Sequence, residues 1–151
     1  MEWIKKRWGG KLVLKGLMDA EDARLAAETG ADAIVVSNHG GRQLDGAPSS
    51  IEALPSMVEA AGNRIEVWMD GGIRSGQDVL KARALGAQGT LIGRSFLYGL
   101  GAYGREGVTR ALQIIHKELD TTMAFCGHTN INNVGKEILL PGTYPLPFAA
   151  A

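Results

Sequence analysis

The hydrophobic side chains of the chain gather in four short runs that are apolar in succession rather than in alternation. The runs cover residues 12–14, 33–36, 66–69 and 89–93. Successive side chains of a strand point to opposite faces, so an unbroken apolar run indicates a strand that is covered on both faces. We therefore predict four buried, parallel strands.

Helix start signals separate the predicted strands. Asp19 precedes an alanine-rich stretch, which is typical of an N-capped helix. Ser49 is followed by Glu52, and Ser75 is followed by Asp78. This spacing of three residues is the capping-box pattern, in which each side chain binds the other's backbone N–H, and it predicts two more helices.

Glycine and proline set the predicted ends and bends of these helices. The first helix is expected to end near Gly30 and the third near Gly86, and the second is expected to kink or restart at Pro55. The fourth and longest helix is predicted from about residue 106 to 123. Its apolar residues recur at helical spacing and form one stripe: Val108, Leu112, Ile115 and Leu119.

Strand and helix thus alternate four times, and a polar loop follows each strand. This order predicts an α/β fold, either a doubly wound parallel sheet or one half of a (β/α)₈ barrel. In both folds ligands bind where the strands end. The residues just after each strand are therefore the candidates for a functional site.

The composition is typical of one soluble globular domain. The 151 residues are enough for a core, and the hydrophobic fraction of 45% argues against a disordered chain. We assign residues 1–151 to a single domain, with strand–helix units over about 1–125 and an irregular tail over 126–151. Basic and acidic residues are equal in number and no basic run contains aromatic residues, so we expect no nucleic-acid partner.

Cysteine usage and the N-terminal segment bear on the compartment. Cys126 is the only cysteine, so no internal disulfide can form, and a reducing cytoplasm is the simplest location. His128 lies two residues from Cys126 and is also a residue type that binds metals. Because the sequence has no second pair of such ligands, we expect no metal site. The N-terminus lacks the apolar stretch of a signal peptide. We expect a cytoplasmic protein, with peripheral contact with the inner membrane left open.

The predicted strand ends carry residues suited to chemistry on an anion. Lys15 follows the first strand, and the second is followed by SNHGGR, which contains His39 and Arg42. A neutral imidazole can take up a proton near neutral pH, and a guanidinium group can hold a carboxylate by two parallel hydrogen bonds. A loop histidine that caps backbone groups, with Arg42 paired to Asp45, would explain the same residues without a site.

The third and fourth strands both lead into glycine next to arginine. The third is followed by DGGIRSG and the fourth by GRS. Exposed N–H groups at a helix N-terminus attract phosphate, and Arg74 and Arg94 add positive charge. In a barrel, a pair of such corners after the last two strands is a frequent phosphate site. The strand ends therefore indicate a phosphorylated cofactor beside an anionic substrate and a base.

Two segments, SNHGGRQLDG and DGGIRSGQDVLKARALGAQGTLIGRSFLYGL, closely resemble the FMN-dependent 2-hydroxy acid dehydrogenases and oxidases. The resemblance extends from EWIKKRWGGKLVLKG to about Pro145. It implies that the α/β units form the (β/α)₄ C-terminal half of a TIM (β/α)₈ barrel, with each parallel strand followed by a helix. It also implies that the protein binds FMN.

The resemblance assigns a role to each candidate residue. His39 matches the catalytic base, and Arg42 matches the arginine that binds the substrate carboxylate together with His39. Lys15 matches the lysine that stabilises negative charge on the reduced flavin. The remaining matches are cofactor-binding residues: Ser37, Asp70, Gly71, Gly72, Ile73, Arg74, Gly93 and Arg94.

These matches imply oxidation of an L-2-hydroxy acid, similar to lactate or glycolate, to the 2-keto acid. The proton reaches His39 either from C2 or from the 2-hydroxyl group, and the electron acceptor stays open among oxygen, a quinone and a cytochrome. The first half of the family's barrel has no counterpart in the sequence, so we expect a fragment that associates with its N-terminal half or forms a homo-oligomer. The alternatives are a non-catalytic remnant that binds FMN or phosphate, and another FMN barrel enzyme.

Overall fold

Parallel strand pairing organises the chain, as the apolar runs predict. A computed structural model describes residues 1–148. It contains a four-stranded sheet in the order β1-β2-β3-β4, and every neighbouring pair is parallel. The strands are β1 (Val13–Leu17), β2 (Ala33–Val36), β3 (Glu66–Met69) and β4 (Gly89–Thr90). The predicted α/β class is confirmed.

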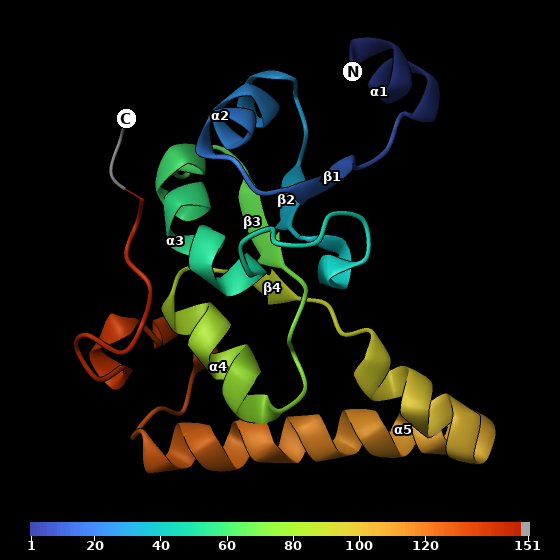
Figure 1. The fold of residues 1–151 in the computed structure, drawn as a ribbon, viewed down its shortest axis with the longest axis vertical. Coiled ribbons are helices and arrows are strands. Elements are labelled where there is room, and N and C mark those ends of the chain that lie inside the picture. Colours follow the sequence, from blue (N-terminus) through green and yellow to red (C-terminus); the bar gives the residue numbers. More distant parts are fainter. Residues whose placement is uncertain (149–151) are drawn as a thin grey trace.

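The strand order and the placement of the helices separate the two predicted architectures. The strands pair in the order of the sequence, without the reversal that defines a doubly wound sheet. Helices α2 (Ala20–Glu28), α3 (Ser50–Ala61) and α4 (Gly76–Ala84) lie on one side of the sheet (Figure 1). This arrangement is that of consecutive units of a (β/α)₈ barrel, whose helices all lie outside the strands.

Two strands differ in length from the prediction. β1 extends to Leu17, so Lys15 lies inside the strand and not after it. β4 ends at Thr90, although the apolar run continues to residue 93. The N–H of Leu91 still donates to the carbonyl of Met69 at 2.9 Å, but the backbone of Gly93 (φ −123°, ψ −94°) then turns the chain into the next helix.

The predicted helix caps are confirmed. The side chain of Asp19 accepts a hydrogen bond from the N–H of Glu21 at 2.8 Å. Both capping boxes form, at Ser49 and at Ser75. The expected break at Pro55 is wrong, because α3 runs through this residue as one helix. Pro55 is the sixth residue of α3, so the helix loses one backbone hydrogen bond there without ending.

The last helix, α5 (Arg94–Phe125), starts well before the predicted residue 106. It bends at Gly104, whose φ of 57° lies in the left-handed region, so it consists of two helical segments. A Cβ at Gly107 would overlap the carbonyl of Gly99, so the segments touch through bare backbone. The predicted apolar stripe is only partly buried, since Leu112 is 50% exposed.

One hydrophobic core lies between the sheet and its helices. The strands contribute Ile34, Val36, Val67 and Met69, and the helices contribute mostly alanine and leucine. Small helix residues allow the helices to approach the sheet closely. The first helix, α1 (Glu2–Trp8), contains no buried residue and lies outside this core.

The segment after α5 packs on α4. It contains two short 3₁₀ turns, η2 (Ile131–Asn133) and η3 (Lys136–Ile138), and Val134 joins a small cluster with Leu80 and Ala84. The guanidinium group of Arg83 donates to the carbonyl oxygens of Ile131, Asn132 and Ala87 at 3.1–3.2 Å. No helix within residues 1–148 is long and apolar enough to cross a membrane.

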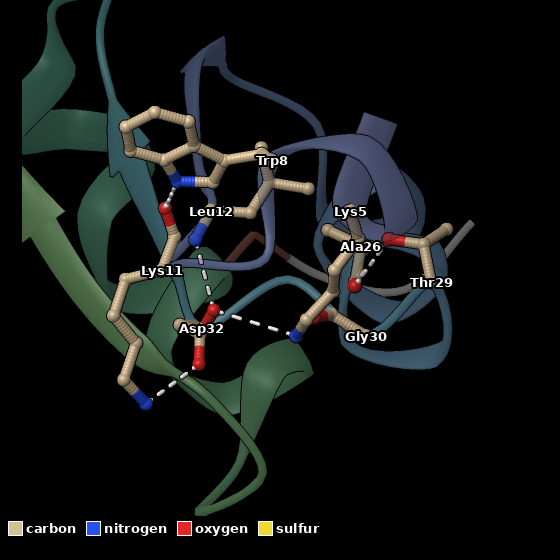
Figure 2. A network of polar contacts seen from close by, with 8 residues as sticks. All are labelled: Lys5, Trp8, Lys11, Leu12, Ala26, Thr29, Gly30 and Asp32. Carbon is tan, nitrogen blue, oxygen red and sulfur yellow. Dashed lines mark hydrogen bonds and ion pairs between the residues drawn. The ribbon is translucent and has the colours of Figure 1, made fainter. Parts of the chain in front are cut away.

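Asp32 fixes the entry of the chain into β1 (Figure 2). One carboxylate oxygen accepts from the N–H of Leu12 at 2.9 Å, and the other pairs with Lys11 at 2.8 Å. Lys5 of α1 also contacts Asp32 and donates to the carbonyl of Gly30. The bonds from Lys11 and Leu12 lower the pKa of Asp32 from 3.8 to about 2.

The close approach of α4 and α5 gives a first testable prediction. A Cβ at Gly76 would overlap the backbone at Leu119, so Gly76→Ala forces the two helices apart. We expect a loss of about 1–3 kcal/mol in the free energy of unfolding. Gly101 has open space around it in α5, so Gly101→Ala is the matched control and should be neutral or stabilising by up to about 1 kcal/mol. Equal urea midpoints for the two variants would contradict the close packing.

The lowered pKa of Asp32 predicts a dependence of stability on pH. Its ionised form stabilises the fold above pH 3.8, and this contribution is lost as the pH falls through about 2. The gap in urea midpoint between the wild type and Asp32→Asn should therefore shrink over this interval. Asp45→Asn is the control, because within residues 1–148 the Asp45 carboxylate forms one hydrogen bond, with the N–H of Gly46, and no ion pair. A gap that stays constant from pH 5 to pH 2 would refute the assignment.

Candidate active site

A cavity of about 450 Å³ lies where the four strands end. The carboxyl ends of parallel strands meet at one edge of a sheet, so residues far apart in the sequence meet there. Every predicted site residue except Ser37 lines it: Lys15, His39, Arg42, Asp70, Gly71, Gly72, Ile73, Arg74, Gly93 and Arg94. The geometry therefore gathers these residues at one site, while their chemical roles stay predictions.

A polar network joins the ends of the first three strands. The Nζ of Lys15 in β1 pairs with Oδ2 of Asp70, just after β3, at 2.6 Å. The same Nζ donates to Oγ of Ser37, just after β2, at 3.1 Å. Ser37 is 1% exposed and does not line the cavity, so it contributes to the site through its hydrogen bond with Lys15.

The two carboxylate oxygens of Asp70 differ in their hydrogen bonding. Oδ2 is taken by Lys15, but Oδ1 is buried and has no hydrogen-bond partner within residues 1–148. A buried carboxylate oxygen without a donor is costly, because it has lost its water without replacement. A ligand hydroxyl group in the cavity could supply that donor.

The backbone of His39 is left-handed. His39 has a φ of 56°, and Gly40 and Gly41 follow at 70° and 71°. A residue with a Cβ is strained there, and such strain is typical of functional sites. Asn38 supports the turn, because its side chain accepts from the N–H of Gly40 at 3.0 Å and donates to the carbonyl of Pro48 at 3.1 Å. The turn holds the imidazole at the cavity.

Arg42 lines the same cavity without a carboxylate partner in the described part of the chain. Asp45, its suggested partner, accepts instead from the N–H of Gly46 at 3.0 Å. The reading of Arg42 and Asp45 as a structural ion pair is therefore wrong. The guanidinium group stays available for an anion from outside.

The backbone N–H groups at the start of α4 are already occupied. The N–H groups of Arg74 and Ser75 donate to Oδ2 of Asp78 at 3.0 and 2.9 Å. The N–H of Gly76 donates to Oε2 of Glu118, which reaches it from α5, at 3.0 Å. The prediction of bare N–H groups at the start of α4 is thus wrong, since carboxylates of the chain occupy them.

The start of α5 retains the expected features of an anion site. Its N-cap, Gly93, provides no side-chain cap, and a Cβ there would meet no atom within 4 Å. Backbone N–H groups at a helix start carry partial positive charge. Gly72, with a φ of 81° and open space around it, adds bare backbone from the loop after β3. Four cationic side chains line the cavity against one carboxylate: Lys15, Arg42, Arg74 and Arg94 against Asp70.

The structure adds residues that sequence reasoning did not assign to the site. Ser95 joins the two glycine–arginine corners, since its Oγ donates to the carbonyl of Ile73 at 2.9 Å. Its place directly after Gly93 and Arg94 was the only sequence signal. Five other lining residues are uncharged, and no chemical feature marked them in the sequence as site residues: Gly40, Gln43, Leu91, Ile92 and Leu97.

Comparison with known proteins gives one consistent family. The FMN-dependent dehydrogenases match residues 1–141. The chain is 52% identical over 139 residues to an L-lactate dehydrogenase of Caulobacter sp. (strain K31), an alignment that covers 92% of the chain and 37% of the relative. It is 46% identical over 140 residues to a pre-mycofactocin synthase of Mycobacterium tuberculosis (strain ATCC 25618 / H37Rv), covering 92% and 35%.

Solved structures agree with the sequence comparison. A mandelate oxidase variant with a monooxide FMN adduct matches with a TM-score of 0.78 and 50% identity, over 80% of this chain and 38% of that one. A variant with (S)-mandelic acid also matches with a TM-score of 0.78. The chain therefore spans little more than a third of the length of the relatives it matches, 37% of the lactate dehydrogenase and 38% of the mandelate oxidase.

The pairing of Lys15 with Asp70 predicts a coupling in stability. Lys15→Met removes the cation from a carboxylate whose other oxygen already lacks a partner, so it should cost about 1–3 kcal/mol. The double variant Lys15→Met/Asp70→Asn no longer buries an unpaired charge. Its cost should be smaller than the sum of the two single costs, measured by urea unfolding. Strict additivity would show that the pair contributes nothing to folding.

Proposed function

The chain belongs to the FMN-dependent dehydrogenase family, and on this premise we propose that it forms the C-terminal half of a barrel that oxidises a 2-hydroxy acid to the 2-keto acid. The single observation that carries the proposal is the cavity at the strand ends. It combines an imidazole, an unpaired guanidinium group, a cation and glycine backbone around one space. Lactate and mandelate appear in the names of the relatives, and both are 2-hydroxy acids.

The residues present fit FMN. The unpartnered Oδ1 of Asp70 can accept a hydrogen bond from a ribityl hydroxyl group. The start of α5, with Arg74 and Arg94, can hold the phosphate, and Gly72 leaves room for it. Lys15 would place positive charge beside the ring system. Bound FMN would accept the two electrons of the oxidation.

Arg42 and His39 would act on the substrate. The guanidinium group of Arg42 can hold the carboxylate by two hydrogen bonds and so orient C2. A ring nitrogen of His39 would take up the proton that the substrate releases, from C2 or from the 2-hydroxyl group. Electrostatic attraction of the anionic substrate to a cavity with four cations supports both steps.

The remaining half of the barrel would come from residues outside this chain. β1 and β4 each pair on one side only, and parallel sheets are stable when both edges and faces are covered. No carboxylate within residues 1–148 forms an ion pair with His39, so a group that orients its ring would have to come from the other half. We propose that four further strand–helix units close the barrel.

The proposed function is tested with the assembled barrel under anaerobic conditions. L-Lactate or (S)-mandelate should bleach the visible absorbance of bound FMN. His39→Asn should slow this reduction about 10²–10⁴-fold while FMN stays bound, because asparagine tolerates the left-handed backbone but cannot serve as the base. Rapid reduction by His39→Asn would exclude the proposed base.

Arg42→Lys serves as a matched control for substrate binding. Lysine keeps the charge but loses the two-pronged hydrogen bonding, so KM should rise more than kcat falls. A chain that retains FMN but is not reduced by any 2-hydroxy acid would indicate a non-catalytic flavin-binding domain instead.

A further inference from the structure

The strand β1 contains an irregularity next to the candidate base. The register with β2 shifts between Lys15 and Leu17, and Gly16 between them has a φ of +105°. A Cβ at Gly16 would lie 2.6 Å from Cε1 and 3.2 Å from Nε2 of His39. Only glycine at position 16 therefore leaves room for the imidazole where it lies.

The register shift in β1, a β-bulge, directs two consecutive residues, Lys15 and Gly16, toward the site. Side chains of neighbouring strand residues normally point to opposite faces. Here the side chain of Lys15 contacts Asp70 and Ser37. A Cβ on the next residue, Gly16, would point at the ring of His39. A β-bulge re-aims residues in this way and is frequent beside active sites.

The backbone of His39 is fixed from the other side. Its N–H donates to Oγ of Ser37 at 3.2 Å, and its φ of 56° leaves few side-chain directions. Ser37 also accepts from Lys15 at 3.1 Å. The backbone anchor and the contact at Gly16 together define where the imidazole lies.

We propose that Gly16 is a positioning residue that sets the place of the His39 imidazole in the cavity. The inference rests on the proposed role of His39 as the base. A side chain at position 16 would displace the ring from its present place, because a Cβ there lies only 2.6 Å from Cε1 of His39. Such a displacement would move the ring away from the proton that it has to accept, whereas the atoms nearest to the added Cβ all belong to His39.

The contact is tested by unfolding of four forms of the assembled, FMN-loaded protein. They are the wild type, Gly16→Ala, His39→Gly and the double variant. Alanine at position 16 is strained by the left-handed backbone in both backgrounds, but it meets an imidazole only when His39 is present. Gly16→Ala should therefore lower the urea midpoint more in the wild type than in His39→Gly. Equal losses in the two backgrounds would overturn the inference.

Steady-state kinetics and NMR distinguish a positioning role of Gly16 from a general loss of stability. Gly16→Ala should lower kcat about 10–100-fold with KM changed less than about threefold, and it should shift the ring proton signal of His39. Gly62→Ala is the control, because Gly62 has a φ of 57° and no atom within 4 Å of an added Cβ. It should leave both readouts unchanged. If Gly16→Ala keeps the wild-type kcat while His39→Asn is inactive, the inference on Gly16 is overturned and the proposed function stands. If His39→Asn is active, the proposed function itself is overturned.

Discussion

Parallel pairing in the order of the sequence is the constraint on which the site depends. It brings Lys15, Ser37, Asp70 and Gly93 from four separate strand–helix units to one edge of the sheet. None of these residues is near another in the chain. Lys15 of β1 forms an ion pair with Asp70 and donates a hydrogen bond to Ser37. These two contacts connect β1 to the residues that directly follow β2 and β3. The fold and the site are thus stabilised by the same contacts.

Much of the fold was predictable because its signals are local. Apolar runs mark buried parallel strands, and the pairs Ser49–Glu52 and Ser75–Asp78 mark helix starts whatever the rest of the chain does. The first segment of α5 was missed, because glycines at 99, 101 and 104 disfavour a helix locally. In the structure its backbone at Gly99 contacts that of Gly107 across the bend, and no local pattern reveals such a contact.

The candidate site was likewise predictable where its signals are local and not where they depend on tertiary contacts. The His39–Arg42 motif and the two glycine–arginine corners were visible in the sequence, and the structure places them around one cavity. The expectation of bare N–H groups at the start of α4 was wrong, since Glu118 reaches the N–H of Gly76 from 42 residues away. No local pattern reveals such a partner. The unpartnered oxygen of Asp70 and the bulge at Gly16 likewise exist only in three dimensions.

The left-handed turn at His39 restricts how this position can evolve. Most amino acids with a Cβ are disfavoured at a φ of 56°, and the β-branched ones most of all. Single substitutions that keep the turn therefore lead mainly to asparagine, aspartate or glycine. Of these three, only aspartate can take up a proton near neutral pH, whereas lysine or glutamate at this position would require the loop to be rebuilt at the same time. The backbone conformation thus narrows the proton acceptors that a single substitution can place here to histidine and aspartate.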